Sequence, residues 1–325
     1  MQNKTVTFDI FLEPEFSVSS LVLIQEALRI SNQYRINETF KSKLITTDGK
    51  RVRSSNGQWW KVDAGLEGIK NPDFIVVVGG NLPVQKKSKK LFSILRVAHK
   101  NLSKIISIDT GAFILAEAGL ITNDTVVCIH WEVKNNFLEK YPNFNIVDDI
   151  YAINRNGLIF SAGGISTLDL ILECIRTLKG KDYVNEIAHA LIYQPRENST
   201  HQKNELLELP LDNICKKAIQ IMEKNIEVPL KINEISKKLN VSLRTLERKF
   251  YKTYKISPIK FYVNLRIKFA RNLLFYDDRK INEISSMAGF SYNSVFINSF
   301  KKIYNKTPSE YRKHFRNQQV DSSVF

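Results

Sequence analysis

Two clusters of polar residues in the first half of the sequence have side chains suited to binding a small ligand. Asp109-Thr110 directly follows the predicted buried strand Lys104–Ile108, and His130-Trp131-Glu132 comes later in the chain. A carboxylate beside an indole can hold an ammonium group by charge pairing and by cation–π attraction, the latter worth about 0.5–2 kcal/mol. Glu132 would add a second carboxylate. These residues predict a site for a small cation.

Each of these residues also has a structural interpretation that the sequence leaves open. Asp109 suits a cap on the helix that follows, His130 a hydrogen-bonded structural histidine, and Trp131 a core or interface aromatic. The predicted effector-binding residues are Gly80, Asp109, Thr110, His130, Trp131 and Glu132.

A second set of candidate residues lies on two predicted helices of the C-terminal third. On the first, Val241, Leu246 and Phe250 are expected to face inward; on the second, Phe300 and either Val295 or Phe296. Arginine can contact guanine with two hydrogen bonds, and asparagine suits adenine. The residues left on the outward faces, which we predict to read DNA bases, are Arg244, Glu247, Arg248, Asn293, Ser294 and Asn298.

These two helices belong to an internal repeat. The hexapeptide KINEIS occurs at residues 231–236 and again at 280–285. Each copy continues as a helix, a turn at Asn240 or Gly289, a serine that can cap the next helix, and a second helix. The repeat therefore predicts two helix-turn-helix units, at about 231–251 and 280–304.

Further helix signals surround the two units. Ser257-Pro258 is typical of a helix start and begins a connecting helix, whose apolar stripe is Phe261, Leu265, Phe269 and Leu273. Thr307-Pro308-Ser309-Glu310 is a capping box that opens the last helix.

The N-terminal part of the chain has the pattern of an α/β domain. The apolar run Phe74–Val78 is a predicted strand, and further predicted strands are Thr5–Leu12, Lys43–Thr47 and Lys104–Ile108. Helical segments separate them, which favours a parallel sheet covered on both faces. We expect an α/β domain over 1–190, a polar linker over 191–209 and an all-α DNA-binding domain over 210–325.

Charge and cysteine usage narrow the class of protein. Residues 204–325 contain 23 Lys and Arg against 12 Asp and Glu, an excess that suits contact with nucleic acid. The three cysteines are spread without a CxxC pair, so neither a disulfide framework nor a zinc site is indicated. No apolar run is long enough to cross a membrane. We expect a cytoplasmic protein with no metal and no cofactor.

The C-terminal helices resemble the DNA-binding domain of the AraC/XylS regulators over about residues 210–316. The resemblance rests on Ala288-Gly289-Phe290 at the turn, on the aromatics of the second recognition helix, and on Thr307-Pro308 followed by Tyr311-Arg312. It implies a double-stranded DNA operator, and RNA polymerase as a further partner if the protein is an activator. Family members often have arginine where Asn298 lies, which leaves the base preference of that helix open.

The N-terminal domain resembles the DJ-1/PfpI superfamily, a class I glutamine-amidotransferase-like α/β sandwich, as found in the GlxA-like regulators. The resemblance rests on Val76–Gly80, Asp109–Leu120, His130–Glu132 and Ser161–Gly164. Enzymes of that superfamily have a cysteine nucleophile where this chain has Asp109. The resemblance therefore implies a regulator that is not an enzyme, that senses a cationic or quaternary-ammonium metabolite, and that forms a homodimer.

Two other interpretations remain open. One is an enzyme of the DJ-1/PfpI class joined to a DNA-binding domain, and Asp109 argues against it because a carboxylate is not a practical acyl-transfer nucleophile. The other is a regulator whose α/β domain only dimerises. The effector, the operator, and the choice between activation and repression cannot be read from the sequence.

Overall fold

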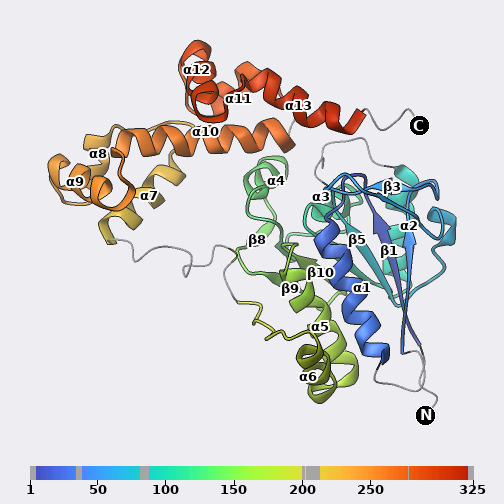
Figure 1. Cartoon of the computed structure of the whole chain (residues 1–325). Coiled ribbons are helices and arrows are strands. Elements are labelled where there is room, and N and C mark those ends of the chain that lie inside the picture. Colours follow the sequence, from blue (N-terminus) through green and yellow to red (C-terminus); the bar gives the residue numbers. More distant parts are fainter. Residues whose placement is uncertain are drawn as a thin grey trace. The chain divides into compact units, whose positions relative to one another are not determined.

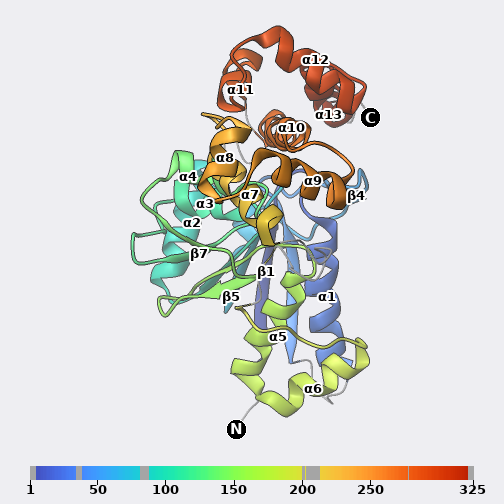
Figure 2. The same ribbon diagram turned by 90° about the vertical axis from the view of Figure 1, so that its left-hand side faces the viewer.

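The computed structural model of the chain describes residues 5–33, 39–80, 88–199, 202, 213–276 and 278–320. It divides into two compact units, residues 1–204 and 205–325. Figures 1 and 2 show both units in cartoon form.

The first unit is built on a six-stranded sheet with the order β2-β1-β5-β6-β10-β9. The strands are β1 (Val6–Leu12), β2 (Phe40–Ile45), β5 (Phe74–Val78), β6 (Lys104–Ile108), β9 (Tyr151–Ile153) and β10 (Leu158–Ser161). The first five in this order are parallel, while β9 pairs antiparallel with β10 at the edge. The predicted strands at Phe74–Val78 and Lys104–Ile108 are confirmed. The strand predicted at Lys43–Thr47 lies earlier, because it pairs with β1 from Phe40 onward.

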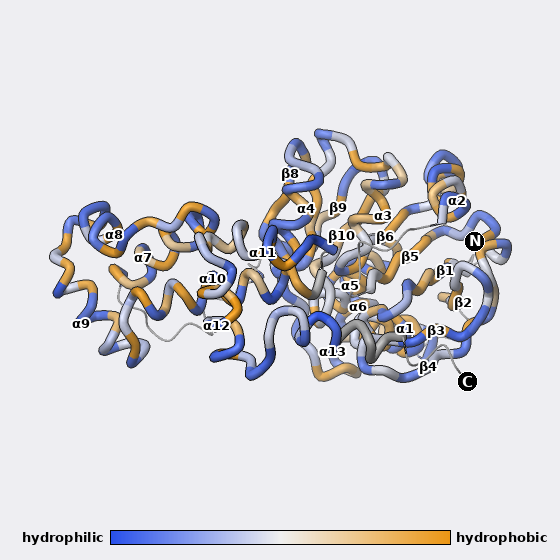
Figure 3. The backbone as a smooth tube through the Cα atoms, turned by 90° about the horizontal axis from the view of Figure 1, so that it is seen from above, coloured by the Kyte–Doolittle hydropathy of each residue, from blue (hydrophilic) through white to orange (hydrophobic). Residues whose placement is uncertain are grey.

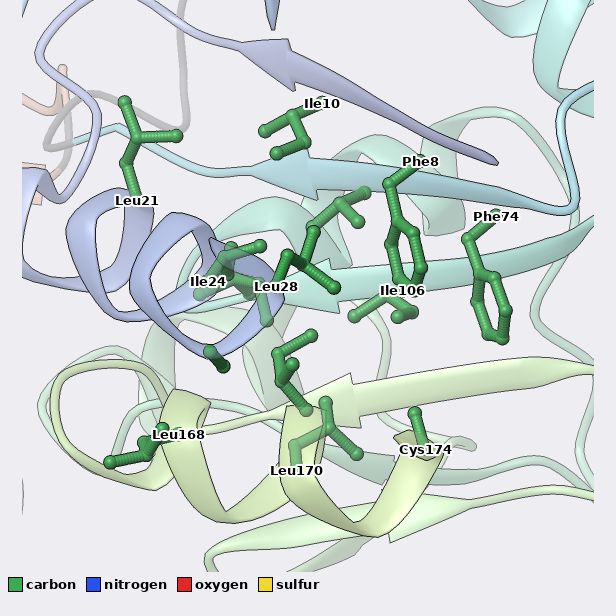
Figure 4. Close-up of a cluster of buried hydrophobic side chains, with 14 of the residues drawn as sticks. Phe8, Ile10, Leu21, Ile24, Leu28, Phe74, Ile106, Leu168, Leu170 and Cys174 are labelled. Atoms are coloured by element: carbon green, nitrogen blue, oxygen red, sulfur yellow. The ribbon is translucent and has the colours of Figure 1, made fainter. Parts of the chain in front are cut away.

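Helices cover both faces of this sheet (Figures 1 and 2). They are α1 (Val18–Gln33), α2 (Lys89–Lys100), α3 (Gly111–Glu117), α4 (Lys134–Lys140), α5 (Ser166–Lys179) and α6 (Lys181–Ala190), with the short 3-10 helix η1 (Leu66–Gly68). Helices α1, α5 and α6 pack together over one face, and their core joins strand residues such as Phe8 and Ile106 with Leu28 and Leu170 (Figure 4). Because side chains alternate along a strand, Ile75 and Ile105 are buried on the opposite face.

Two small sheets complete the first unit. They are formed by β3 (Val52–Arg53) with β4 (Trp59–Trp60), and by β7 (Val126–Cys128) with β8 (Asn145–Val147). Coloured by hydropathy, the central strand β5 is orange because its residues are all apolar (Figure 3).

The predicted linker begins with residues that pack against the first unit. Arg196 forms an ion pair with the buried carboxylate of Asp169 at 2.7 Å, and the Tyr193 hydroxyl donates to the same carboxylate. Gln202 also contacts this unit. Residues 200, 201 and 203–212 lie outside the described residues.

The second unit is helical. Its helices are α7 (Asn213–Lys224), α8 (Ile232–Lys238), α9 (Leu243–Tyr254), α10 (Pro258–Tyr276), α11 (Ile281–Met287), α12 (Asn293–Tyr304) and α13 (Pro308–Val320). The repeated KINEIS segments form α8 and α11. Each of these helices starts in the same way, because Glu234 and Glu283 accept the backbone N–H of Lys231 and Lys280.

Helix α10 connects two hydrophobic cores in this unit (Figure 1). Its first half packs in one core, where Tyr262 meets Leu246 and Phe250. Its second half packs in the other, where Leu273 meets Phe300. Two predicted helix starts are confirmed: Ser257 Oγ accepts the Lys260 N–H, and Thr307 and Glu310 bond each other as a capping box. None of the described helices is long and apolar enough to span a membrane.

Candidate effector site and DNA-binding helices

Asp109 lies at a sharp turn between β6 and α3. Its backbone has φ +57°, in the left-handed region that few non-glycine residues adopt. Its N–H donates to Ser161 O at 3.0 Å, which ties the end of β6 to the end of β10. The N-cap of α3 is Thr110, whose hydroxyl donates to Gly80 O at 2.6 Å. Asp109 is therefore not the helix cap that the sequence left open.

The loops that follow four neighbouring strands meet at this turn. Because β1, β5, β6 and β10 are parallel, their carboxyl ends lie at one edge of the sheet, where α/β folds place their ligands. Glycines let these loops approach one another. A β-carbon on Gly80 would lie 2.0 Å from Pro14 O, and one on Gly79 would lie 2.3 Å from the Gly111 nitrogen.

The electrostatic environment of Asp109 opposes its ionisation. The pKa of Asp109 is raised to about 6, mainly by burial and also by Glu132, against the lowering effects of His130 and the Thr110 backbone N–H. Asp109, His130 and Glu132 therefore lie close enough to interact, as expected from the sequence. At neutral pH the carboxylate is charged but poorly solvated, which favours pairing with a cation.

The segment His130–Glu132 has no regular secondary structure and is held by hydrogen bonds. Its three side chains are half-buried, and the rings of His130 and Trp131 lie 5.8 Å apart. Gln202 binds the backbone here from a distant part of the chain: Oε1 accepts the Trp131 N–H at 2.9 Å, and Nε2 donates to Ile129 O at 3.0 Å and Asp149 O at 2.9 Å.

Several residues near this edge were missed by the sequence reasoning. Glu13 and Glu15 follow β1 as Asp109 follows β6, and burial raises the pKa of Glu15 while Arg53, 3.8 Å away, lowers it. Their position after a predicted strand was the available signal. Gly163 lies in the segment Ser161–Gly164 that carried the family resemblance but was not predicted as a site residue, and Gln202 carried no local signal, because its contacts join distant segments.

A cavity of about 560 Å³ lies away from the Asp109 turn, in the segment that follows α6. It is lined by Gln194, Pro195, Arg196, Glu197 and Ser199. None of these residues belongs to the predicted effector set.

The three cysteines do not supply a reactive thiol at the Asp109 turn. Cys128, Cys174 and Cys215 are all buried. Cys128 Sγ donates to Asp149 O at 3.0 Å, and burial raises the pKa of its thiol. Burial raises the pKa of Cys174 to about 12. A buried, protonated thiol is a poor nucleophile.

In the second unit, the predicted base-reading residues lie on the outer faces of α9 and α12. Arg244, Glu247 and Arg248 are exposed on α9, while Leu246 and Phe250 are buried. Asn293, Ser294 and Asn298 are exposed on α12, while Phe296 and Phe300 are buried. Because Leu246 corresponds to Phe296 and Phe250 to Phe300, Arg248 and Asn298 occupy matching positions.

The structure decides one point about α12 that the sequence left open and differs from the pattern at another. Val295 was one of two candidates for the inward position, but it is 51% exposed and Phe296 is buried instead. Ser291 was expected to cap the helix, but the N-cap is Tyr292, which makes no side-chain cap hydrogen bond. Helix α12 thus begins one residue later than a cap at Ser291 would give, and Phe296 packs in the core with Phe300.

Arg266 of α10 packs against the second helix-turn-helix. Its guanidinium donates to Ala288 O at 2.8 Å and Gly289 O at 2.6 Å, and lies 4.1 Å from the ring centre of Phe290. It therefore joins the connecting helix α10 to the turn of the second helix-turn-helix.

Comparisons with known proteins agree with this architecture. Residues 9–177 match the DJ-1/PfpI family, and residues 235–314 match a helix-turn-helix domain family. The chain is 31% identical over 312 residues to the HTH-type transcriptional regulator CdhR of Pseudomonas aeruginosa, covering 94% of this chain and 91% of that protein. The chain belongs to the GlxA-like AraC/XylS family of transcription regulators.

Other GlxA-like relatives extend over most of the chain. The regulator GlxA of Rhizobium meliloti is 27% identical over 305 residues, covering 92% of this chain and 93% of that protein. The regulator GbdR of Pseudomonas aeruginosa is 29% identical over 302 residues, covering 92% and 82%.

A solved structure shares the fold of the first unit. An AraC family transcriptional regulator from Pseudomonas putida has a TM-score of 0.51 at 23% identity, covering 57% of this chain and 99% of that one. The chain is thus a DNA-binding transcription regulator with a DJ-1/PfpI-like domain.

Proposed function

We propose that this regulator reads its operator through α9 and α12 and is controlled by a small cation bound at Asp109. The observation that supports the first part is the matched exposure of Arg248 and Asn298 on two repeated recognition helices. A recognition helix enters the major groove and presents such side chains to base edges. The base-reading set is the one predicted from the sequence.

Binding-site selection with the full-length protein tests the DNA-reading assignment. Arg248→Ala and Asn298→Ala should each relax the preference at particular base pairs, at about 1–3 kcal/mol. Lys302→Ala is the matched control: Lys302 is exposed on α12 and should weaken all sequences alike. Unchanged selected sequences for both of the first two variants would refute the assignment.

The cationic effector is supported by the charges around Asp109. The carboxylates of Asp109 and Glu132 repel each other, and the groups that favour the charged form of Asp109 are His130 and the backbone N–H of Thr110. A ligand ammonium would relieve this repulsion and replace the hydration that burial removes. Trp131 on the same segment can add cation–π attraction.

Calorimetry with arginine, carnitine and glycine betaine, with glutamate as the anionic control, tests this part. Asp109→Asn keeps the shape of the side chain and should weaken a bound cation by about 1.5–3 kcal/mol. Asp48→Asn, an exposed aspartate, should have no effect. Binding of glutamate alone, or equal cation affinity in wild type and Asp109→Asn, would contradict the proposal. If no panel member binds, the domain serves dimerisation alone.

We further propose that the DJ-1/PfpI-like domain is not an enzyme. Asp109 in place of cysteine and the burial of all three cysteines support this. We also propose a cytoplasmic homodimer that contacts RNA polymerase if it activates transcription. Light scattering measures the molar mass in solution and tests the dimer. Hydrolysis of activated esters or amides by the purified protein would contradict the proposal that the domain is not an enzyme.

A further inference from the structure

The outer face of α12 has an apolar strip at its N-terminal end. Val295 is 51% exposed and Tyr292, one turn earlier, is 72% exposed. Asn298 lies one turn after Val295 on the same side of the helix. The strip therefore adjoins the side chain that occupies the base-reading position.

The residues of this strip do not stabilise the start of α12. Tyr292 is the N-cap and provides no side-chain hydrogen bond. In α9 the equivalent residue is Ser242, whose Oγ accepts the Thr245 N–H at 3.1 Å. A lost side-chain cap typically lowers helix stability. Residues that break local rules without a structural gain mark functional positions.

The two recognition helices share a β-branched residue at this position. Thr245 of α9 corresponds to Val295 of α12. The Thr245 hydroxyl lies 2.8 Å from Ser242 Oγ and is used within the cap. Val295 has a methyl group in place of that hydroxyl and has no such role in its own helix.

We propose that Val295 contacts the C5 methyl group of a thymine in the major groove, with Tyr292 covering the contact, so that α12 distinguishes thymine from bases without that methyl. Thymine is the one base whose major-groove edge presents a methyl group, and small apolar side chains are its natural partners. This inference rests on the proposed placement of α12 in the major groove.

The test replaces each thymine of the α12 half-site by deoxyuridine, which removes only the methyl group. The site is the one selected by the full-length wild-type protein. Wild type should lose about three- to fivefold in affinity at one thymine, as expected for a single buried methyl. Val295→Ala should bind thymine and deoxyuridine at that position with equal affinity. Val295→Thr, which keeps a methyl group, should still lose part of the wild-type affinity when the thymine is replaced.

The control is Ile303→Ala, which removes another partly exposed apolar side chain of α12, two turns from Val295. It should keep the wild-type response to deoxyuridine. Equal affinity of wild type for thymine and deoxyuridine at every position, or an unchanged response in Val295→Ala, would overturn the inference. Asn298→Ala separates this inference from the proposed function when the deoxyuridine test fails. If Asn298→Ala leaves the selected site unchanged, base reading by α12 itself is refuted. If Asn298→Ala changes the selected site, only the role of Val295 is refuted.

Discussion

The backbone of Gly163 lies directly against the side chain of Asp109. A β-carbon at Gly163 would come within 2.9 Å of Asp109 Cβ and 3.0 Å of its Oδ2, closer than real side chains approach. Gly163 follows β10 and Asp109 follows β6, so the contact joins neighbouring strands at the edge where the predicted effector residues gather. The position of the carboxylate therefore depends on the absence of a side chain at residue 163.

Gly163→Ala should destabilise the first unit and displace Asp109. Gly163 has φ +91°, which is unfavourable for alanine, and the added methyl also meets the carboxylate. We expect a loss of about 1–3 kcal/mol in the free energy of unfolding. Gly180→Ala is the matched control, since Gly180 has φ +90° with nothing within 4 Å. Urea denaturation of both variants gives the comparison, and an equal loss in the two would show that the contact with Asp109 is unimportant.

Asp109→Asn should stabilise the ligand-free protein at pH 7.5 but not at pH 4. The folded-state pKa of about 6 lies above the ordinary value of 3.8, so the stability of wild type falls as pH rises through that range. The difference corresponds to about 3 kcal/mol at most. Other titrating groups are shared by the two proteins and cancel in the comparison. Denaturation at both pH values measures the gap, and a gap independent of pH would contradict the buried carboxylate.

Arg266→Ala should destabilise the second unit. The change leaves the carbonyls of Ala288 and Gly289 without this donor and removes the stacking on Phe290. We expect a loss of about 2–4 kcal/mol. Arg266→Lys should recover little of it, because one ammonium cannot reproduce the fork of a guanidinium. Lys260→Ala, an exposed change on the same helix, is the control in thermal denaturation. Full stability of Arg266→Ala would show that its contacts are dispensable.

Gln202→Ala should release the segment that contains His130 and Trp131. The Trp131 N–H loses its acceptor and two carbonyls lose a donor, so the Trp131 amide should exchange its hydrogen faster by at least tenfold. Gln202→Glu keeps the acceptor but places a negative charge against the carbonyls of Ile129 and Asp149. The Trp131 amide should therefore exchange as fast in Gln202→Glu as in Gln202→Ala. Hydrogen exchange with mass spectrometry measures this, with a peptide from α5 as the internal reference. Unchanged exchange at Trp131 would contradict the role of Gln202.

The sequence alone determined the local elements and their repetition. Phe74–Val78 and Lys104–Ile108 were predicted as strands with the observed bounds. A short, mostly apolar segment that ends at a glycine or at Asp109 is typical of a buried strand in an α/β chain. The capping box at Thr307 was equally readable, since its hydrogen bonds lie within one turn. These features depend on neighbours in the chain, and their residue types carry the information.

Only the tertiary structure decided the contacts between distant segments. Three such contacts have partners that the local sequence does not indicate. They are the close approach of Gly163 to Asp109, the hydrogen bond of Gln202 to Trp131 and the hydrogen bond of Arg266 to Gly289. The choice between Val295 and Phe296 was also made by packing: Phe296 is buried in the core with Phe300, and Val295, about 100° further round the helix, is exposed. Periodicity defines a face, but the core that packs against it determines which residue faces inward.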